Sequence, residues 1–294
     1  MNTPKTQMPS WQLNDIDAKL IDLALEEDLH IPFTDITSDA LFKNTQKKQT
    51  AKIISKHSTD IVISGIPIIA ALFKKIGADY KIQTNYKDGD ILKPGKTLLT
   101  IQSDAKSILM IERTLLNFLR HLCAIATLTK KFVTLTKDTQ TKILDTRKTT
   151  PAMRHLEKYA VHCGGGVNHR IGLYDAFMIK DTHVGLIGGM KKALDALPDK
   201  SNNPFPVIVE ISSKDELNTA IKFGSNKINR VLLDNMSPEL LQQCVDLCKD
   251  IFETEASGNI NLQTIATIAK TGVDYASVGM LTYAAGHVDL AMII

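Results

Sequence analysis

The sequence predicts an α/β protein in which an N-terminal α+β unit precedes a parallel βα barrel. After Lys142, short apolar segments alternate with helical stretches. Such alternation is typical of a parallel sheet, either closed into a barrel or doubly wound. No Gly-x-Gly-x-x-Gly motif follows the first of these segments, so a dinucleotide fold is disfavoured and the barrel is preferred.

The N-terminal third predicts helices and strands in mixed order. Asp15–Glu27 has apolar residues at helical spacing behind an Asn14/Asp15 cap, which indicates a helix. Turn sequences such as Pro94-Gly95 separate short apolar runs, and we expect these runs to share one small sheet. The expected strands are Ala51–Ser55, Ile61–Ser64, Tyr80–Thr84 and Thr97–Ile101, with a helix at Ile66–Ile76.

A long helix is expected from Ser107 to about Thr136, bridging two domains. This stretch contains almost no Gly or Pro and has a repeating apolar face. Glu112, Arg113 and Arg120 interrupt that face, and their ordinary interpretation is as solvated or paired side chains.

Composition excludes several classes of protein. Hydrophobic residues make up 44% and charged residues 23%, as in ordinary globular proteins. A net charge of +3 is too small to predict a nucleic-acid or membrane-surface partner. The polar start and the lack of a long apolar run favour a cytoplasmic location. The four cysteines are sparse; Cys244 and Cys248 share a helical face, but buried thiols are expected there rather than a metal site.

Polar residues stand at the end of every strand expected in the barrel. Active sites of parallel barrels lie at the carboxyl ends of the strands, so a series of such residues outweighs the usual interpretation of one charged strand end as solvated. The mouth of the barrel therefore has cations, acids and glycines suited to phosphorylated substrates. In order, the strand ends carry Asp145-Thr146-Arg147-Lys148, Lys180-Asp181, Glu210, Asp234-Asn235, Glu255 with Ser257-Gly258, and Ser277-Val278-Gly279.

The loop between the first two barrel strands is the densest in cations. Arg147 and Lys148 begin it, and Gly164-Gly165-Gly166 precedes His169 and Arg170. Arginine suits carboxylate or phosphate oxygens, and lysine supplies a compact point charge. A flexible glycine loop beside a solvated basic patch is the alternative, and anion binding is favoured.

Two histidines of the barrel region have ordinary interpretations, whereas two of its acids are candidates for functional roles. His155 and His162 are expected on a helix as ordinary side chains, and the role of His183 stays open. Glu210 and Asp234 are candidates to hold Mg²⁺ through water or to stabilise positive charge on a sugar. The backbone around Ser257, Gly258 and Gly279 offers N–H groups for a phosphate.

Six stretches together resemble the quinolinate phosphoribosyltransferase family. They run through nearly the full chain, and the long central stretch is the most specific. They are EDLHIPFTDITS (27–38), ERTLLNFLRHLCAIAT (112–127), DTRKTTPAMRHLEKYAVHCGGGVNHRIGLYDAFMIKDTH (145–183), LLDNMSPE (232–239), EASGNI (255–260) and GVDYASVGMLT (272–282).

The resemblance implies a fold and its division. It implies an N-terminal α/β sandwich-like domain at 1–118, an incomplete parallel α/β barrel at 119–279, and a tail at 280–294 that returns to the first domain. It also implies transfer of the phosphoribosyl group of phosphoribosyl pyrophosphate to quinolinate with decarboxylation, giving nicotinate mononucleotide, pyrophosphate and CO₂ in de novo NAD synthesis.

The resemblance further implies residue roles. The two carboxylates of quinolinate would be held by Arg113, Arg147, His169, Arg170 and Lys180. Lys148 would assist at the pyrophosphate, Glu210 and Asp234 would lie by the ribose, and Ser257, Gly258 and Gly279 would take the 5-phosphate. Mg²⁺ would accompany the pyrophosphate. Arg113 would reach a neighbouring subunit's site, so a homodimer or larger homo-oligomer is expected.

Two positions depart from the family pattern, and two other functions compete. Ile208 stands where relatives often have an acid, and Tyr283 where they often have Lys or His, so no role is assigned to Tyr283–His287.

A related phosphoribosyltransferase-like protein of molybdate transport would lack the dicarboxylate pocket that Asn168-His169-Arg170 and Lys180 predict. A silent binding protein is disfavoured by Lys148, Glu210 and Asp234.

Overall fold

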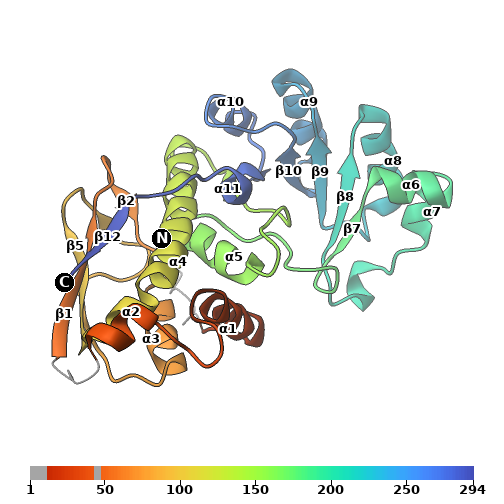
Figure 1. Ribbon diagram of the computed structural model, residues 1–294. Coiled ribbons are helices and arrows are strands. Elements are labelled where there is room, and N and C mark those ends of the chain that lie inside the picture. Colours follow the sequence, from red (N-terminus) through yellow and green to blue (C-terminus); the bar gives the residue numbers. More distant parts are fainter. Residues whose placement is uncertain (1–11, 43–47) are drawn as a thin grey trace. The chain divides into compact units, whose positions relative to one another are not determined.

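The computed structural model describes residues 12–42 and 48–294, which form two compact units (Figure 1). The first unit contains the described residues up to Thr127, with Thr150–Gly164 and Ala285–Ile294. The second contains Leu128–Thr149 and Gly165–Ala284. The domain bounds implied by the resemblance stay a prediction, and most of the polar start lies outside the described residues.

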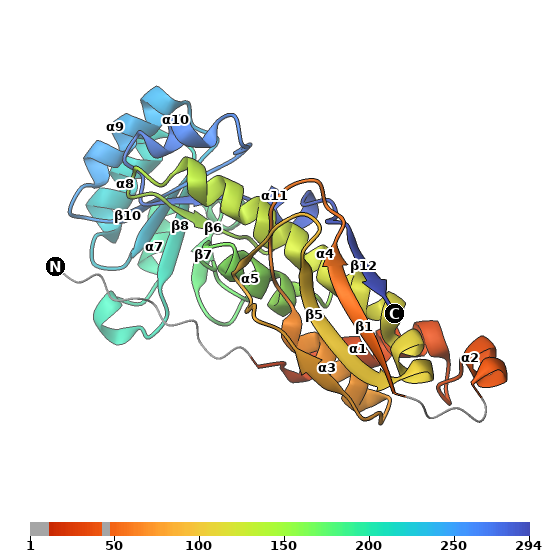
Figure 2. The same ribbon diagram turned by 90° about the vertical axis from the view of Figure 1, so that its left-hand side faces the viewer.

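An antiparallel sheet of four strands forms the centre of the first unit. Its strand order is β12-β1-β5-β3, so the last strand of the chain pairs with the first, as the returning tail predicts (Figures 1 and 2). The strands are β1 (Lys48–Ser55), β3 (Lys81–Gln83), β5 (Thr97–Asp104) and β12 (Leu290–Ile293).

One expected strand lies outside that sheet. β2 (Ile61–Val62) pairs only with β4 (Ile91–Leu92), so the expectation of a single small sheet is wrong for this segment. The physical reason is that Gly65 turns the chain at φ +106° into a helix, and the Asp88 carboxylate accepts from the N–H groups of Gly65 and Ile66.

Two helices of the first unit begin at side chains that cap them. Asn14 forms a capping box at the start of α1 (Asp15–Leu29), as its sequence predicts. The Asp35 side chain caps α2 (Ile36–Leu41), a helix that the sequence analysis did not predict. Two further helices are α3 (Ile66–Lys75) and α5 (Arg154–Cys163). The expected single long helix is confirmed as α4 (Ala105–Leu135), whose residues are divided between the two units.

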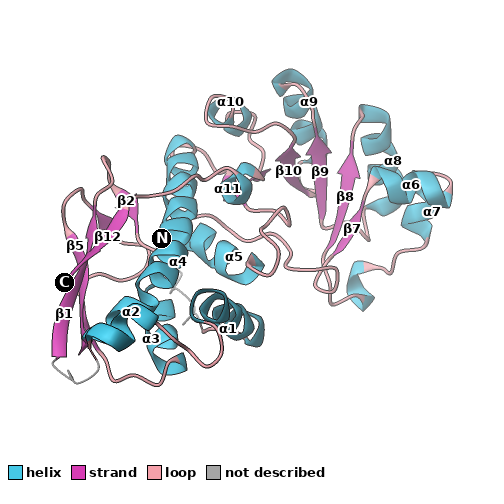
Figure 3. Ribbon diagram, in the orientation of Figure 1, coloured by secondary structure: helices cyan, strands magenta, loops and turns pink. Residues whose placement is uncertain are grey.

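The second unit contains a parallel sheet of six strands in the order β6-β11-β10-β9-β8-β7. Figure 3 shows the part of this sheet from β10 to β7. No pairing joins β6 to β7 among the described residues, so the sheet is an incomplete barrel, as expected. The strands are β6 (Lys142–Leu144), β7 (Phe177–Ile179), β8 (Val207–Ile211), β9 (Arg230–Asp234), β10 (Glu253–Ser257) and β11 (Tyr275–Ser277).

Short helices follow the strands of the second unit. Ser213 and Ser237 cap two of them, each accepting a backbone N–H with its hydroxyl oxygen. These helices are α6 (Asp181–Ile187), α7 (Met190–Asp195), α8 (Lys214–Gly224), α9 (Pro238–Cys248), α10 (Ile265–Ala269) and α11 (Met280–Tyr283), with a 3-10 turn at Lys200–Asn202. In the described part of the chain, no helix combines the length and apolar character needed to cross a membrane. All four cysteines are buried and free of disulfide bonds, which confirms the burial predicted for Cys244 and Cys248.

Candidate active site

A cavity of about 580 Å³ lies at the carboxyl ends of the second unit's strands. The parallel strands bring their ends to the same edge, which is why residues far apart in sequence meet there. Ten of the predicted site residues line this cavity: Arg147, Lys148, His169, Arg170, Lys180, Glu210, Asp234, Ser257, Gly258 and Gly279. Arg113, the remaining one, is exposed on α4 in the first unit.

Strand register places a cation and an acid side by side. Ile179 of β7 is opposite Val209 of β8, so Lys180 and Glu210 follow at the same level. The Lys180 Nζ lies 3.3 Å from the Glu210 Oε2, and the lysine side chain keeps 47% of its surface exposed. Such an open ion pair adds little stability, so the charge of Lys180 remains available to an anion.

A buried carboxylate fixes the cation-rich loop. Asp145 is fully buried, and it accepts from the Asn168 side-chain amide at 2.6 Å and from the His169 backbone N–H at 2.8 Å. Beside it, Leu144 and Val167 form an isolated parallel bridge. Asp145 therefore positions the loop after the glycine triplet, and it does not line the cavity.

The guanidinium groups of Arg147 and Arg170 both line the cavity, and their positive charges repel each other. Burial lowers the pKa of Arg170 from its ordinary value, and the positive charge of Arg147 lowers it further. Arg170 Nη1 donates to the Ala176 carbonyl at 3.2 Å, which aims the side chain. Like charges held together in this way favour a bound anion, because an anion relieves their repulsion.

The acids occupy neighbouring strands. Glu210 lies in β8 and Asp234 ends β9, and Asp234 Oδ2 accepts from the Asn235 side-chain amide at 2.7 Å. No group of three or more metal-ligating side chains occurs among the described residues. The two carboxylates thus fit an ion such as Mg²⁺ that keeps waters and substrate phosphate oxygens as ligands, and they do not form an all-protein metal cage.

A tight glycine turn lies next to these acids. Gly258 has φ +95°, and a Cβ placed there would come within 2.1 Å of the Asn235 Oδ1. The same Asn235 atom accepts from the Asn259 side chain at 3.2 Å, so the turn and the end of β9 support each other. The position needs glycine both for its backbone angle and for this close approach.

Gly279 brings two other site residues close together. A Cβ there would lie 3.0 Å from Tyr283 Cε1 and 3.2 Å from Lys148 Cδ. The Thr282 hydroxyl donates to the Lys148 carbonyl at 2.6 Å, which fixes this part of the cavity wall. Tyr283 lines the cavity, although the sequence assigned it no role; its position just after the last barrel strand was the available signal.

The structure shows where His183, His155 and His162 lie relative to the cavity. His183 was left open, and its Nδ1 accepts from the Lys180 backbone N–H at 3.0 Å, which caps α6. His155 lies on α5 in the first unit, where its Nδ1 is 2.5 Å from Asp17 Oδ2. His162 lies in the last turn of α5. None of these three lines the cavity.

Comparison with known proteins decides the family. Residues 35–123 match the N-terminal domain of quinolinate phosphoribosyl transferase and residues 125–293 match its C-terminal domain. The chain belongs to the quinolinate phosphoribosyltransferase family. A probable nicotinate-nucleotide pyrophosphorylase (carboxylating) from Bacillus subtilis strain 168 is 36% identical over 88% of this chain and 87% of that protein.

Other members of the quinolinate phosphoribosyltransferase family agree in sequence and structure. Quinolinate phosphoribosyltransferase (decarboxylating) 1b of Nicotiana tabacum is 34% identical over 97% of this chain and 83% of its own. The nicotinate-nucleotide pyrophosphorylase structure from Francisella tularensis is 36% identical, with a TM-score of 0.88 over 98% of this chain and 99% of that one. The chain is therefore an enzyme of this family, and the expected fold is confirmed.

Proposed function

We propose that the chain transfers the phosphoribosyl group of phosphoribosyl pyrophosphate to quinolinate and releases CO₂ and pyrophosphate, giving nicotinate mononucleotide for NAD synthesis. One observation carries the proposal beyond family membership. Arg147, Arg170 and Lys180 meet in one cavity with the carboxylates of Glu210 and Asp234 and a glycine turn. A dicarboxylate and a sugar phosphate each find complementary groups there.

Quinolinate would be held by the cations. The guanidinium groups of Arg147 and Arg170 bind carboxylate oxygens, and Lys180 supplies a point charge at the end of β7. Held in this way, the pyridine nitrogen attacks the anomeric carbon of the sugar as pyrophosphate leaves. The positive pyridinium nitrogen stabilises the electron pair left on the neighbouring ring carbon when its carboxylate departs as CO₂, and a proton from water then adds to that carbon. No covalent enzyme nucleophile is needed.

Charge on the sugar would be balanced by the acids. Glu210 and Asp234, which line the cavity, would stabilise positive charge on the ribose, while the backbone near Ser257, Gly258 and Gly279 would take the 5-phosphate. Lys148 assists at the pyrophosphate. Mg²⁺ bound with the pyrophosphate supplies charge neutralisation of the leaving group, and Glu210 and Asp234 would hold it through water.

The proposal includes a homodimer or larger homo-oligomer. Arg113 is exposed on α4 and would serve a neighbouring subunit's site. Mixing Arg113→Ala subunits with Arg147→Ala subunits tests this directly, because hybrid assemblies would regain one intact site. Equal inactivity of the mixture and of each variant would reject the shared site. A cytoplasmic location and the absence of nucleic-acid or membrane partners stay predictions.

The reaction itself is tested by purified protein with Mg²⁺, phosphoribosyl pyrophosphate and either quinolinate or nicotinate. We expect CO₂ and the mononucleotide from quinolinate only, because the cation set matches two carboxylates. Turnover of nicotinate without turnover of quinolinate would overturn the proposal. Binding of phosphoribosyl pyrophosphate without any turnover would instead indicate a silent binding protein.

A further inference from the structure

A buried carboxylate forms part of the floor of the anion cavity. Glu255 is fully buried, yet it lines the same cavity as Arg147 and Lys180. An uncompensated negative charge at this place would oppose a substrate that carries carboxylates and phosphates. Burial alone would also disfavour an ionised Glu255. The groups around Glu255 must therefore offset its charge.

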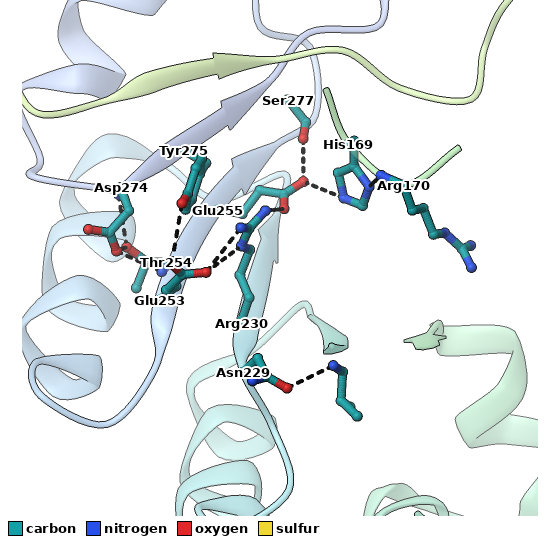
Figure 4. Close-up of polar contacts among 11 residues, drawn as sticks. His169, Arg170, Asn229, Arg230, Glu253, Thr254, Glu255, Asp274, Tyr275 and Ser277 are labelled. Atoms are coloured by element: carbon teal, nitrogen blue, oxygen red, sulfur yellow. Dashed lines mark hydrogen bonds and ion pairs between the residues drawn. The ribbon is translucent and has the colours of Figure 1, made fainter. Parts of the chain in front are cut away.

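Three side chains from different segments meet at Glu255 (Figure 4). Oε1 accepts from the Ser277 hydroxyl and lies 3.3 Å from the His169 Nε2, while Oε2 accepts from the Arg230 Nη1 at 3.2 Å. Burial raises the pKa of Glu255, but the hydrogen bonds from His169 and Ser277 and the charge of Arg230 bring it below its ordinary value. Glu255 is therefore ionised at neutral pH.

Arg230 reaches Glu255 from the opposite end of its strand. It is the first residue of β9, whereas Asp234, at the last position, lines the active-site cavity. Its guanidinium carbon lies 3.7 Å from the centre of the Tyr275 ring, and its Nη2 lies 3.0 Å from the Glu253 Oε2. Aromatic stacking and two carboxylates thus hold the cation in one orientation.

Arg230 is placed outside the substrate cavity. It lines a second cavity of about 340 Å³ with Asn229 and Glu253, at the amino ends of β8 to β10, and His169 and Arg170 line both cavities. The active-site lining has four Lys or Arg side chains and three carboxylates, a formal balance of +1. Counting Arg230 with Glu255 raises that balance to +2, without placing another side chain against the substrate.

We propose that Arg230 is a positioning residue that neutralises Glu255 and fixes its carboxylate, so that His169 and Arg170 are oriented in a cavity that stays positive for the dicarboxylate. His169 connects the two parts: its Nε2 faces Glu255, and its Nδ1 accepts from the Arg170 backbone N–H at 2.7 Å. Rotation of the imidazole would therefore disturb the backbone that carries Arg170. This inference rests on the proposed quinolinate site.

The test compares four variants by steady-state kinetics with quinolinate, after wild-type turnover of quinolinate has been established. Arg230→Met removes the charge and keeps an apolar chain of similar length. We expect its KM for quinolinate to rise at least about tenfold, with kcat changed less than about threefold, because a buried charge is left uncompensated. Arg230→Lys keeps the charge and should restore most of the affinity.

The decisive variant combines Arg230→Met with Glu255→Gln. The amide oxygen still accepts from His169 and Ser277, but no charge remains to oppose quinolinate, so we expect KM within about threefold of wild type. Glu253→Gln is the matched control: it removes the charge of the half-exposed partner of the same arginine but keeps an oxygen that accepts from it, and it should leave KM unchanged.

Each outcome has a distinct meaning. A wild-type KM in Arg230→Met, or a defect in the double variant as large as in Arg230→Met, would overturn the inference. If Arg230→Met does not fold, the double variant is still measured, and a tenfold or greater rise in its KM would also reject charge compensation. Absence of quinolinate turnover in the wild type would reject the proposed function instead.

Discussion

Replacing Gly258 by alanine should damage the site and the fold together. The backbone at Gly258 has φ +95°, and the new Cβ would approach Asn235 Oδ1 to 2.1 Å and the Asn235 backbone nitrogen to 2.9 Å. The backbone strain alone costs about 1–3 kcal/mol. Since a backbone atom is among those contacted, the end of β9 must shift as well.

The magnitude follows from these contacts. A loss of about 2 kcal/mol would lower Tm by roughly 4–8 °C in a domain of this size. Asn235 also donates to Asp234 at 2.7 Å, so its displacement moves a carboxylate of the site. Losing one hydrogen bond to a phosphate costs about 1.5–3 kcal/mol, so kcat/KM for phosphoribosyl pyrophosphate should fall about 10–100-fold.

Gly95→Ala is the matched control for Gly258→Ala. Gly95 has φ +71° and nothing within 4 Å of a built Cβ, so its substitution introduces backbone strain without a clash. Calorimetry and kinetics with varied phosphoribosyl pyrophosphate should show a small loss of Tm, about 2–4 °C, and normal kcat/KM for this control. Equal effects of the two substitutions on Tm and kcat/KM would refute the reasoning.

Three further predictions concern charges. Arg147→Ala should weaken quinolinate binding severely while circular dichroism stays that of wild type; unchanged quinolinate affinity would contradict its assignment. Lys180→Met should lower kcat/KM for quinolinate about 10–100-fold with Tm changed by less than about 2 °C, since its ion pair with Glu210 is open to solvent; a large loss of Tm would show a structural role. Burial raises the pKa of Asp88 above its ordinary value of 3.8, so its stabilising contribution is complete below that pH and is lost as pH rises through the raised value. Asp88→Asn should therefore flatten the dependence of unfolding free energy on pH above about pH 4, measured by urea titration; an unchanged slope would refute this.

The active-site residues were predictable because parallel strands present their carboxyl ends at one edge. Arg147, Lys180, Glu210 and Asp234 each follow or end an apolar run, and the cavity contains all of them. The same rule shows why Arg230 was missed. It begins its strand, and the carboxylate that it contacts lies on the neighbouring strand, so only the register between β9 and β10 relates the two.

Other features depended on contacts between distant segments. The pairing of β2 with β4 depends on how Asp88 satisfies the backbone at Gly65, which no periodicity reveals. Helix α2 is only six residues long, too short for an apolar repeat, and its one signal is the cap at Asp35. The role of His183 required the position of the Lys180 N–H group.

The pairing of β12 with β1 has a consequence for synthesis of the protein. Ser55 meets Leu290, so the β1 edge of the first sheet stays open until residue 290 has left the ribosome. An exposed strand edge is a site for pairing with other chains, and bringing such distant segments together is slow. A nascent chain would therefore carry this vulnerable edge until β12 has been made, and a bulky insertion directly after β12 would interfere with the step that closes it.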